Sequence, residues 1–200
     1  MPDPYPDKSD IGDYLENSDI IDSDHPLVAQ IAEQLTNGHK DNLSKARVIY
    51  KFTRDHIFNS FDINATSVTI TASEVLDKGH GVCFARAHLL AALMRASGIP
   101  AGFCYQIRYY NDLERLVAHG FNGVYIQELD NWVRIDASMH VDADDWNFDP
   151  FKDSTVRSVQ EDIGESDDYI VYHSPSKKLL KAMYVSDTLE EFINLIPSEI

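Results

Sequence analysis

The chain has 200 residues, with 17 Lys or Arg against 33 Asp or Glu, and a formal net charge of −16. A surface this acidic repels phosphate backbones and anionic lipid, so neither a nucleic acid nor a membrane is expected as a partner. Cys83 and Cys104 are too few for a disulfide scaffold or a four-cysteine zinc site. The length and an apolar content of 44% predict one globular domain with short appendages.

The N-terminal sequence MPDPYPDKSD has no basic segment followed by an apolar one, and no stretch approaches about 18 apolar residues. We therefore expect a cytoplasmic protein with both thiols reduced. Residues 1–24 are acidic and interrupted by prolines, which predicts an extended or loosely docked N-terminal arm. Residues 25–150 are assigned to the core domain, and residues 151–200 to a helical C-terminal extension packed on it.

Helices are predicted in the first half of the core. Asp24 is a candidate cap for a helix over residues 26–36, and a second helix is expected over residues 44–58. A capping-box pattern that begins at Thr71 predicts a short helix ending at Gly79.

A longer helix is predicted over residues 83–97, where strong helix formers follow one another. Its apolar residues occupy adjoining faces, and Gly98 and Pro100 provide a C-terminal stop. The pattern indicates a central helix that is buried on nearly every side.

Beyond this helix the apolar period changes from 3.6 to 2. The alternation predicts three strands, over residues 103–109, 117–125 and 132–136. Two short helices are expected in the tail, over residues 175–184 and 187–195, the second with a cap at Asp187. Helices followed by an antiparallel sheet are typical of the α+β class.

Cys83 lies where a loop becomes the central helix. Only a thiolate is an effective nucleophile, and the free N–H groups and dipole of a helix N-terminus favour an anion. Gly81 lets the backbone approach closely and leaves room for a substrate acyl group. A lone cysteine is more often a small buried hydrophobe, so the interpretation of Cys83 as a nucleophile depends on a base within reach.

His119 and Asp136 lie on two consecutive predicted strands. If the two residues are directly opposite, the hairpin centre falls between residues 127 and 128, beside the polar segment 127–131. Opposed residues share a face and are close enough to hydrogen-bond. A turn centred on Asp130 would instead place His119 roughly 13 Å from the position opposite Asp136. The sequence permits the pair without requiring it.

Together, Cys83, His119 and Asp136 supply a nucleophile, a base and an orienting carboxylate. His119 would hold the thiolate as an ion pair and then protonate the leaving amine, while Asp136 would select the imidazole tautomer. The backbone N–H of Cys83 is a candidate donor to an oxyanion. Weaker candidates for a second donor are Gln106, Tyr105 and Tyr109.

Five segments, in this order, resemble the transglutaminase-like superfamily, the papain-related cysteine enzymes. They are ASEVL, GHGVC ending at Cys83, LLAALMRASGIPA, HGFNGVY beginning at His119, and WVRID ending at Asp136. The resemblance covers about residues 45–140, and residues 164–175 weakly resemble the tail of one bacterial branch. It implies a central helix carrying the cysteine, packed on an antiparallel sheet carrying the histidine and the aspartate, with those three residues as the catalytic set and no cofactor.

Three positions depart from the common family pattern. Phe121 replaces a frequent tryptophan, Ala137-Ser138 replaces a frequent Pro-Thr, and Phe84-Ala85 replaces residues that are often polar or acidic. These positions are expected to line the cleft, so the family resemblance leaves the identity of the substrate open.

Metal sites are only weakly indicated. A set of His80, Cys83, His119 and Asp136 is conceivable, with His140 also nearby in sequence, but HxxC lacks a second close pair of ligands. Residues 142–145 resemble the start of a calcium loop, yet Asn147 and Asp153 occupy the positions that require Gly and Glu. A solvated acidic loop is predicted there, and Cys104 is predicted to be a core thiol.

The function predicted from the sequence is acyl transfer through a thioester at Cys83. Hydrolysis of an amide or peptide bond is expected first, because water is the abundant acceptor unless a dry cleft excludes it, and transamidation to an amine is expected next. The expected partner is a peptide or protein amide substrate. The alternative is a transglutaminase-like fold that serves as a catalytically silent binding module.

Overall fold

The computed structural model describes residues 3–138 and 156–200. Four helices come first, namely α1 (Pro26–Thr36), α2 (Asn42–His56), α3 (Ala72–Lys78) and α4 (Cys83–Ala96). The main sheet is antiparallel and has the order β6 (Asn131–Ile135), β5 (Arg115–Ile126), β4 (Ala101–Tyr110) and β7 (Ser166–Asp167). The last two helices are α5 (Lys177–Val185) and α6 (Leu189–Leu195). The predicted α+β class, with a central helix on an antiparallel sheet, is confirmed.

Short elements complete the described part of the chain. Two parallel strand pairs join β1 (Tyr5–Pro6) to β8 (Ile170–Val171) and β2 (Phe58–Asn59) to β3 (His80–Gly81). Single 3₁₀ turns cover Ile11–Leu15, Asn111–Leu113, Gln127–Leu129 and Glu161–Ile163. The second and third of these turns connect β4 to β5 and β5 to β6, so that the three long strands form a meander.

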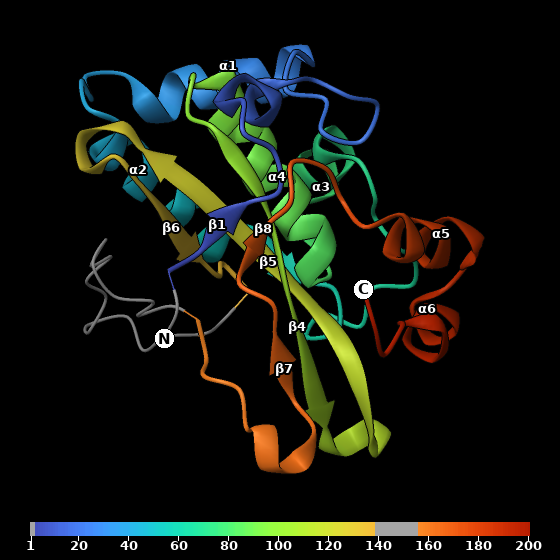
Figure 1. Cartoon of the computed structure of the whole chain (residues 1–200). Coiled ribbons are helices and arrows are strands. Elements are labelled where there is room, and N and C mark those ends of the chain that lie inside the picture. Colours follow the sequence, from blue (N-terminus) through green and yellow to red (C-terminus); the bar gives the residue numbers. More distant parts are fainter. Residues whose placement is uncertain (1–2, 139–155) are drawn as a thin grey trace.

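Helix α4 forms the centre of the molecule, as its composition predicts. All of its residues from Phe84 to Arg95 are buried. It contacts α1, α2 and α3 on one side and β4 and β5 on the other (Figure 1). A helix with apolar side chains on every face can pack against neighbours on all sides. It therefore lies in the interior and not at the surface. Only its two end residues are not buried, since Cys83 is partly exposed and Ala96 is exposed.

Two helix caps differ from the predicted ones by one residue. Helix α1 begins at Pro26 as predicted, but His25 rather than Asp24 caps it, through a 3.3 Å hydrogen bond from the N–H of Leu27. Helix α6 is capped by Thr188 rather than Asp187. There the Thr188 hydroxyl accepts from the backbone N–H three residues later, and the returning carboxylate completes a capping box.

The N-terminal arm is packed more closely than predicted. Tyr14 and Ile21 are fully buried. The Tyr14 hydroxyl lies 2.8 Å from Oδ1 of Asp7 and 2.9 Å from the carbonyl oxygen of Val171. The arm is therefore not loosely docked at these residues, because Tyr14 packs against a cluster from the C-terminal half of the chain and Ile21 belongs to the main core.

The register of β5 and β6 differs from the directly opposed arrangement. Asn122 pairs with Ile135 along this ladder, so the hairpin centre lies between residues 128 and 129. His119 and Asp136 are therefore displaced from one another by two residues, although alternation keeps them on the same face of the sheet.

The C-terminal extension is attached to the edge of β5 that β6 leaves open. The N–H of Ala118 donates to the carbonyl oxygen of Pro197 at 2.7 Å, and the Arg115 guanidinium donates to carbonyl oxygens of α6 and the residue after it. The acidic segment at residues 142–145, His140 and the assigned boundary at residue 150 lie outside the described residues. Among the described helices, none is both long and apolar enough to cross a membrane.

Candidate active site

Cys83 occupies the first position of α4. The first intrahelical hydrogen bond runs from the N–H of Arg86 to the carbonyl oxygen of Val82, and the Val82 side chain provides no cap. The N–H groups of residues 83–85 therefore have no partner within the helix. Free N–H groups at this end favour negative charge, both on a sulfur atom and on an oxygen that reacts beside it.

His119 and Asp136 form a buried hydrogen-bonded pair. Nε2 of His119 lies 2.7 Å from Oδ2 of Asp136, and their side chains are 4% and 1% exposed. The other carboxylate oxygen accepts from the backbone N–H of Ser138 at 2.9 Å and from its hydroxyl at 2.5 Å. With both of its oxygens engaged, the carboxylate holds the imidazole in one orientation.

Cys83 lies close enough to the His119 side chain to contribute to its raised pKa. Because Nε2 already contacts Asp136, Nδ1 is the ring nitrogen left for the sulfur. The Tyr110 hydroxyl lies 3.4 Å from that same Nδ1. The structure therefore brings together a thiol from the start of α4, an imidazole from β5 and a carboxylate just beyond β6.

The charges in this cluster reinforce one another. Burial by itself lowers the pKa of His119, but the negative charges of Asp136 and Cys83 and their hydrogen bonds outweigh burial and raise the pKa to about 9. Burial by itself raises the pKa of Asp136, whereas His119, Ser138 and Arg108 together lower it below its ordinary value. The arrangement thus favours an imidazolium between two negative groups.

Protonation of His119 should make folding stability depend on pH. A folded-state pKa of about 9, above the unfolded value of about 6.5, stabilises the folded protein fully below about pH 6.5. This contribution is lost as the pH rises through about 9. We expect the free energy of unfolding in urea to fall over that interval more steeply for the wild type than for His119→Gln, which cannot take up the proton. Parallel curves for the two proteins would contradict the raised pKa.

Gln106 was expected as an oxyanion donor and Gly81 as the residue that leaves room for the acyl group, but both have other roles in the structure. Gln106 lies opposite His119 in the register, but its amide nitrogen donates to Asp167 at 2.7 Å and to the carbonyl oxygen of Arg157 at 3.2 Å. Both of its N–H groups are thereby used. At Gly81, a Cβ would lie 3.0 Å from the Cβ of Ala85, so the missing side chain lets the loop pack on α4 rather than making room for an acyl group. The expected roles of both residues find no support.

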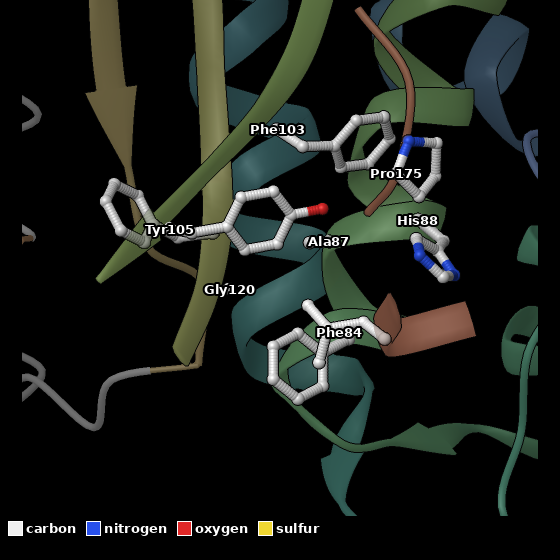
Figure 2. Close-up of a pocket in the computed structure, with 9 residues that line it drawn as sticks. Phe84, Ala87, His88, Phe103, Tyr105, Gly120 and Pro175 are labelled. Carbon is white, nitrogen blue, oxygen red and sulfur yellow. The ribbon is translucent and has the colours of Figure 1, made fainter. Parts of the chain in front are cut away.

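Tyr105 and Tyr109 are not placed to donate to an oxyanion at Cys83. The Tyr105 hydroxyl accepts from the N–H of Ser176 at 2.8 Å. The Tyr105 side chain lines a small separate cavity together with Gly120 of β5 and with Ala87 and other residues of α4 (Figure 2). Tyr109 is 38% exposed, and strand alternation places it on the face opposite to His119.

Two further residues belong to the site and were not expected from the sequence, namely Arg108 and Tyr110. Nη2 of Arg108 lies 3.8 Å from Oδ2 of Asp136, and its Nε donates to Gln106 at 2.7 Å. A signal for both was present in the sequence, because Gln106, Arg108 and Tyr110 alternate along β4, and the pairing of Gln106 with His119 places all three on the face of the histidine.

A cavity of about 300 Å³ opens beside Cys83. Its walls come from the turn at residue 61, the start of α4, the end of β4, the start of β5, and α6. Phe192, Ile193 and Ile196 contribute the wall from the C-terminal helix and the residue after it. A partly exposed sulfur beside a cavity, backed by a buried base, is an arrangement suited to nucleophilic attack on a bound carbonyl group.

The structure also shows the surroundings of His80 and Cys104. His80 hydrogen-bonds the Ser60 hydroxyl at 2.9 Å. Within residues 3–138 and 156–200, no group of three or more His, Cys, Asp or Glu side chains is placed to hold a metal ion. Cys104 is fully buried in an apolar cluster with Tyr14 and Phe121, which confirms the prediction of a core thiol.

Comparisons with known proteins agree with this architecture. The crystal structure of "a Putative Cysteine Protease from Cytophaga hutchinsonii" is 24% identical, with a TM-score of 0.55 over 66% of this chain and 43% of that chain. The periplasmic domain of TgpA from Pseudomonas aeruginosa is 19% identical, with a TM-score of 0.45 over 62% of this chain and 45% of that chain. This chain therefore spans less than half of either solved chain, and the likeness to the Cytophaga hutchinsonii structure concerns the fold alone.

The sequence comparisons identify the family directly. No curated protein matches the chain. The family model described as the transglutaminase-like superfamily matches residues 29–137, which is more than half of the chain and includes the thiol, the imidazole and the carboxylate of the site. The chain belongs to the transglutaminase-like superfamily.

Proposed function

We propose that this protein is a thiol enzyme that transfers an acyl group through a thioester at Cys83. The observation that carries the proposal is the buried hydrogen bond between His119 and Asp136, next to a Cys83 that lines an open cavity. The raised pKa of His119 supports a thiolate and an imidazolium as the resting pair.

In the first step the Cys83 thiolate attacks the carbonyl carbon of an amide, and a C–S bond forms. The negative charge that develops on the carbonyl oxygen faces the free N–H groups at the start of α4. The C–N bond then breaks, and the His119 imidazolium gives its proton to the departing amine. Asp136 keeps the other ring nitrogen hydrogen-bonded throughout, so the imidazole that remains has the tautomer needed for the second step.

In the second step neutral His119 removes a proton from the acceptor, which attacks the thioester carbon. The C–S bond breaks, and the thiolate and imidazolium are restored. Water as acceptor gives hydrolysis of an amide or peptide bond, and an amine gives transamidation. We favour hydrolysis, because the cavity beside Cys83 opens to solvent and water is the abundant nucleophile.

The second candidate function is a binding module that keeps the fold without catalysis. Binding alone does not require a thiol that lies next to a histidine with a raised pKa. The reactivity of Cys83 therefore separates the two functions.

Cys83 should react with iodoacetamide well below pH 8, because His119 stabilises its thiolate. We expect its rate at neutral pH to exceed that of the buried Cys104 by orders of magnitude. Mass spectrometry of peptides after timed alkylation measures both rates.

The two cysteines differ in exposure as well as in their distance from a base. His119→Gln is therefore the matched control, because it removes the base and leaves Cys83 at the same position. The reactivity of Cys83 at neutral pH should fall at least tenfold in that variant. Equal rates for the wild type and His119→Gln would favour the binding module.

A further inference from the structure

We infer that the cavity beside Cys83 binds a single uncharged apolar group on the acyl side of the substrate, next to the carbonyl that is attacked. The inference rests on the proposed function and specifies its substrate class. It concerns the cavity whose walls are described above, here called the Cys83 cavity.

The lining of the Cys83 cavity is mainly apolar. Besides the sulfur, aliphatic and aromatic side chains from four separate segments surround it. The lining residues are Phe61, Val82, Phe84, Leu113, Val117, Ala118, Phe192, Ile193 and Ile196, with Tyr110 and Asp112. Among the described residues of this lining, Asp112 is the only acidic or basic one. An apolar group that enters gains free energy from burial, whereas a charged group would lose hydration, and Asp112 is exposed to solvent and repays little of that loss even for a cation.

The cavity is built by fixed elements and is not a gap beside a loose tail. The Arg115 guanidinium donates to the carbonyl oxygens of Ile193 at 2.6 Å and Ile196 at 2.9 Å. The N–H of Ala118 donates to the carbonyl oxygen of Pro197 at 2.7 Å. These bonds attach the α6 wall to β5, the strand that carries His119. The wall and the base therefore keep a constant separation.

The charge and the volume of the Cys83 cavity restrict further which acyl groups can bind. Asp112, in a chain of net charge −16, disfavours an anionic acyl group at this position. A volume of about 300 Å³ is at the lower end of the range for small-molecule sites, which suits one side chain of leucine or phenylalanine size rather than a long chain. The sulfur is part of the lining, so an acyl carbon bonded to it places its nearest substituent in the cavity.

Acyloxymethyl ketones that carry leucine, aspartate or lysine next to the ketone test this inference. The Cys83 thiolate displaces the carboxylate of such a probe and forms a thioether, so the rate reports the acyl side alone. We expect the leucine probe to label Cys83 at least tenfold faster than the aspartate and lysine probes. Intact-mass spectrometry over time gives the rates.

A matched pair of variants on α6 locates the effect. Ile193 lines the cavity and is partly exposed, whereas Leu195 is 48% exposed and lies outside the lining. Ile193→Arg should slow the leucine probe at least tenfold, and Leu195→Arg should leave it within about twofold. The ratio of the leucine-probe rate to the iodoacetamide rate, which corrects for any change in the reactivity of the thiol itself, should fall at least tenfold in Ile193→Arg and stay within about twofold in Leu195→Arg.

Two results would overturn the inference, and they are distinguishable. If iodoacetamide labels Cys83 rapidly but the three ketones react at equal rates, or Ile193→Arg has no effect, the cavity does not select the acyl group and the proposed function remains. If Cys83 is unreactive even toward iodoacetamide at neutral pH, the proposed function fails and the inference fails with it.

Discussion

Replacing Cys83 with alanine is expected to abolish turnover and covalent labelling at this site while leaving the fold intact. The sulfur is the only protein atom in the proposed mechanism that bonds to the acyl group. Cys83 is partly exposed at a cavity edge, so its loss should change the free energy of unfolding by no more than about 1–2 kcal/mol. The measurements are the rate of labelling with the acyloxymethyl ketones, the rate of turnover and the melting temperature.

Cys83→Ser is the companion variant, because it keeps a polar atom next to His119. We expect it to retain little turnover, since a serine hydroxyl is far less acidic than a thiol and the site stabilises a thiolate. Unfolding of both variants, or full turnover in both, would show that Cys83 has a structural role and that the catalytic interpretation is wrong.

Asp136→Asn should lower the rate of acyl transfer by about 10³–10⁴-fold in a protein that still folds. An amide in place of the carboxylate can donate to Nε2 of His119 and so permits the wrong tautomer. The loss of the negative charge also removes a main cause of the raised pKa of His119, so Cys83 should need a higher pH to react. Turnover and the pH profile of Cys83 alkylation measure the two effects.

Stability should fall in this variant, by about 1–3 kcal/mol, because Arg108 stays buried 3.8 Å from a group that has lost its charge. Ser138→Ala is the control, since it deletes one hydrogen bond to Asp136 and keeps the carboxylate, and we expect it to lower turnover less than tenfold. An Asp136→Asn protein with normal turnover and an unchanged pH profile would remove Asp136 from the mechanism.

The local elements were predictable from the sequence because their signals lie within a few residues of each other. Pro26 marks the start of α1, and Gly79, with φ of 70°, ends α3 in the left-handed conformation that glycine favours. The run from Cys83 to Ala96 contains strong helix formers with apolar residues on every face, which predicts both a helix and its burial. Family motifs then singled out Cys83, His119 and Asp136.

Only the tertiary structure decided how the strands align and which polar groups remain free. The alternation of a strand repeats every two residues, so several registers bury the same faces, and the turn at residues 127–129 selects one of them. That register offsets His119 from Asp136. The register of β4 on β5 is a separate alignment, and it places Tyr110, rather than Tyr109, on the face of the histidine.

The fate of Gln106 and the wall of the Cys83 cavity depend on segments distant in sequence. Gln106 is occupied by Asp167, which lies 61 residues later in the chain. Ile193 reaches the cavity because Arg115, 78 residues earlier, binds its carbonyl oxygen. No local pattern encodes such contacts, since they form only when the folded chain brings remote donors and acceptors together. The sequence by itself therefore determined the reactive groups and the helices that carry them, and the tertiary structure decided which partners those groups have and what kind of substrate can approach them.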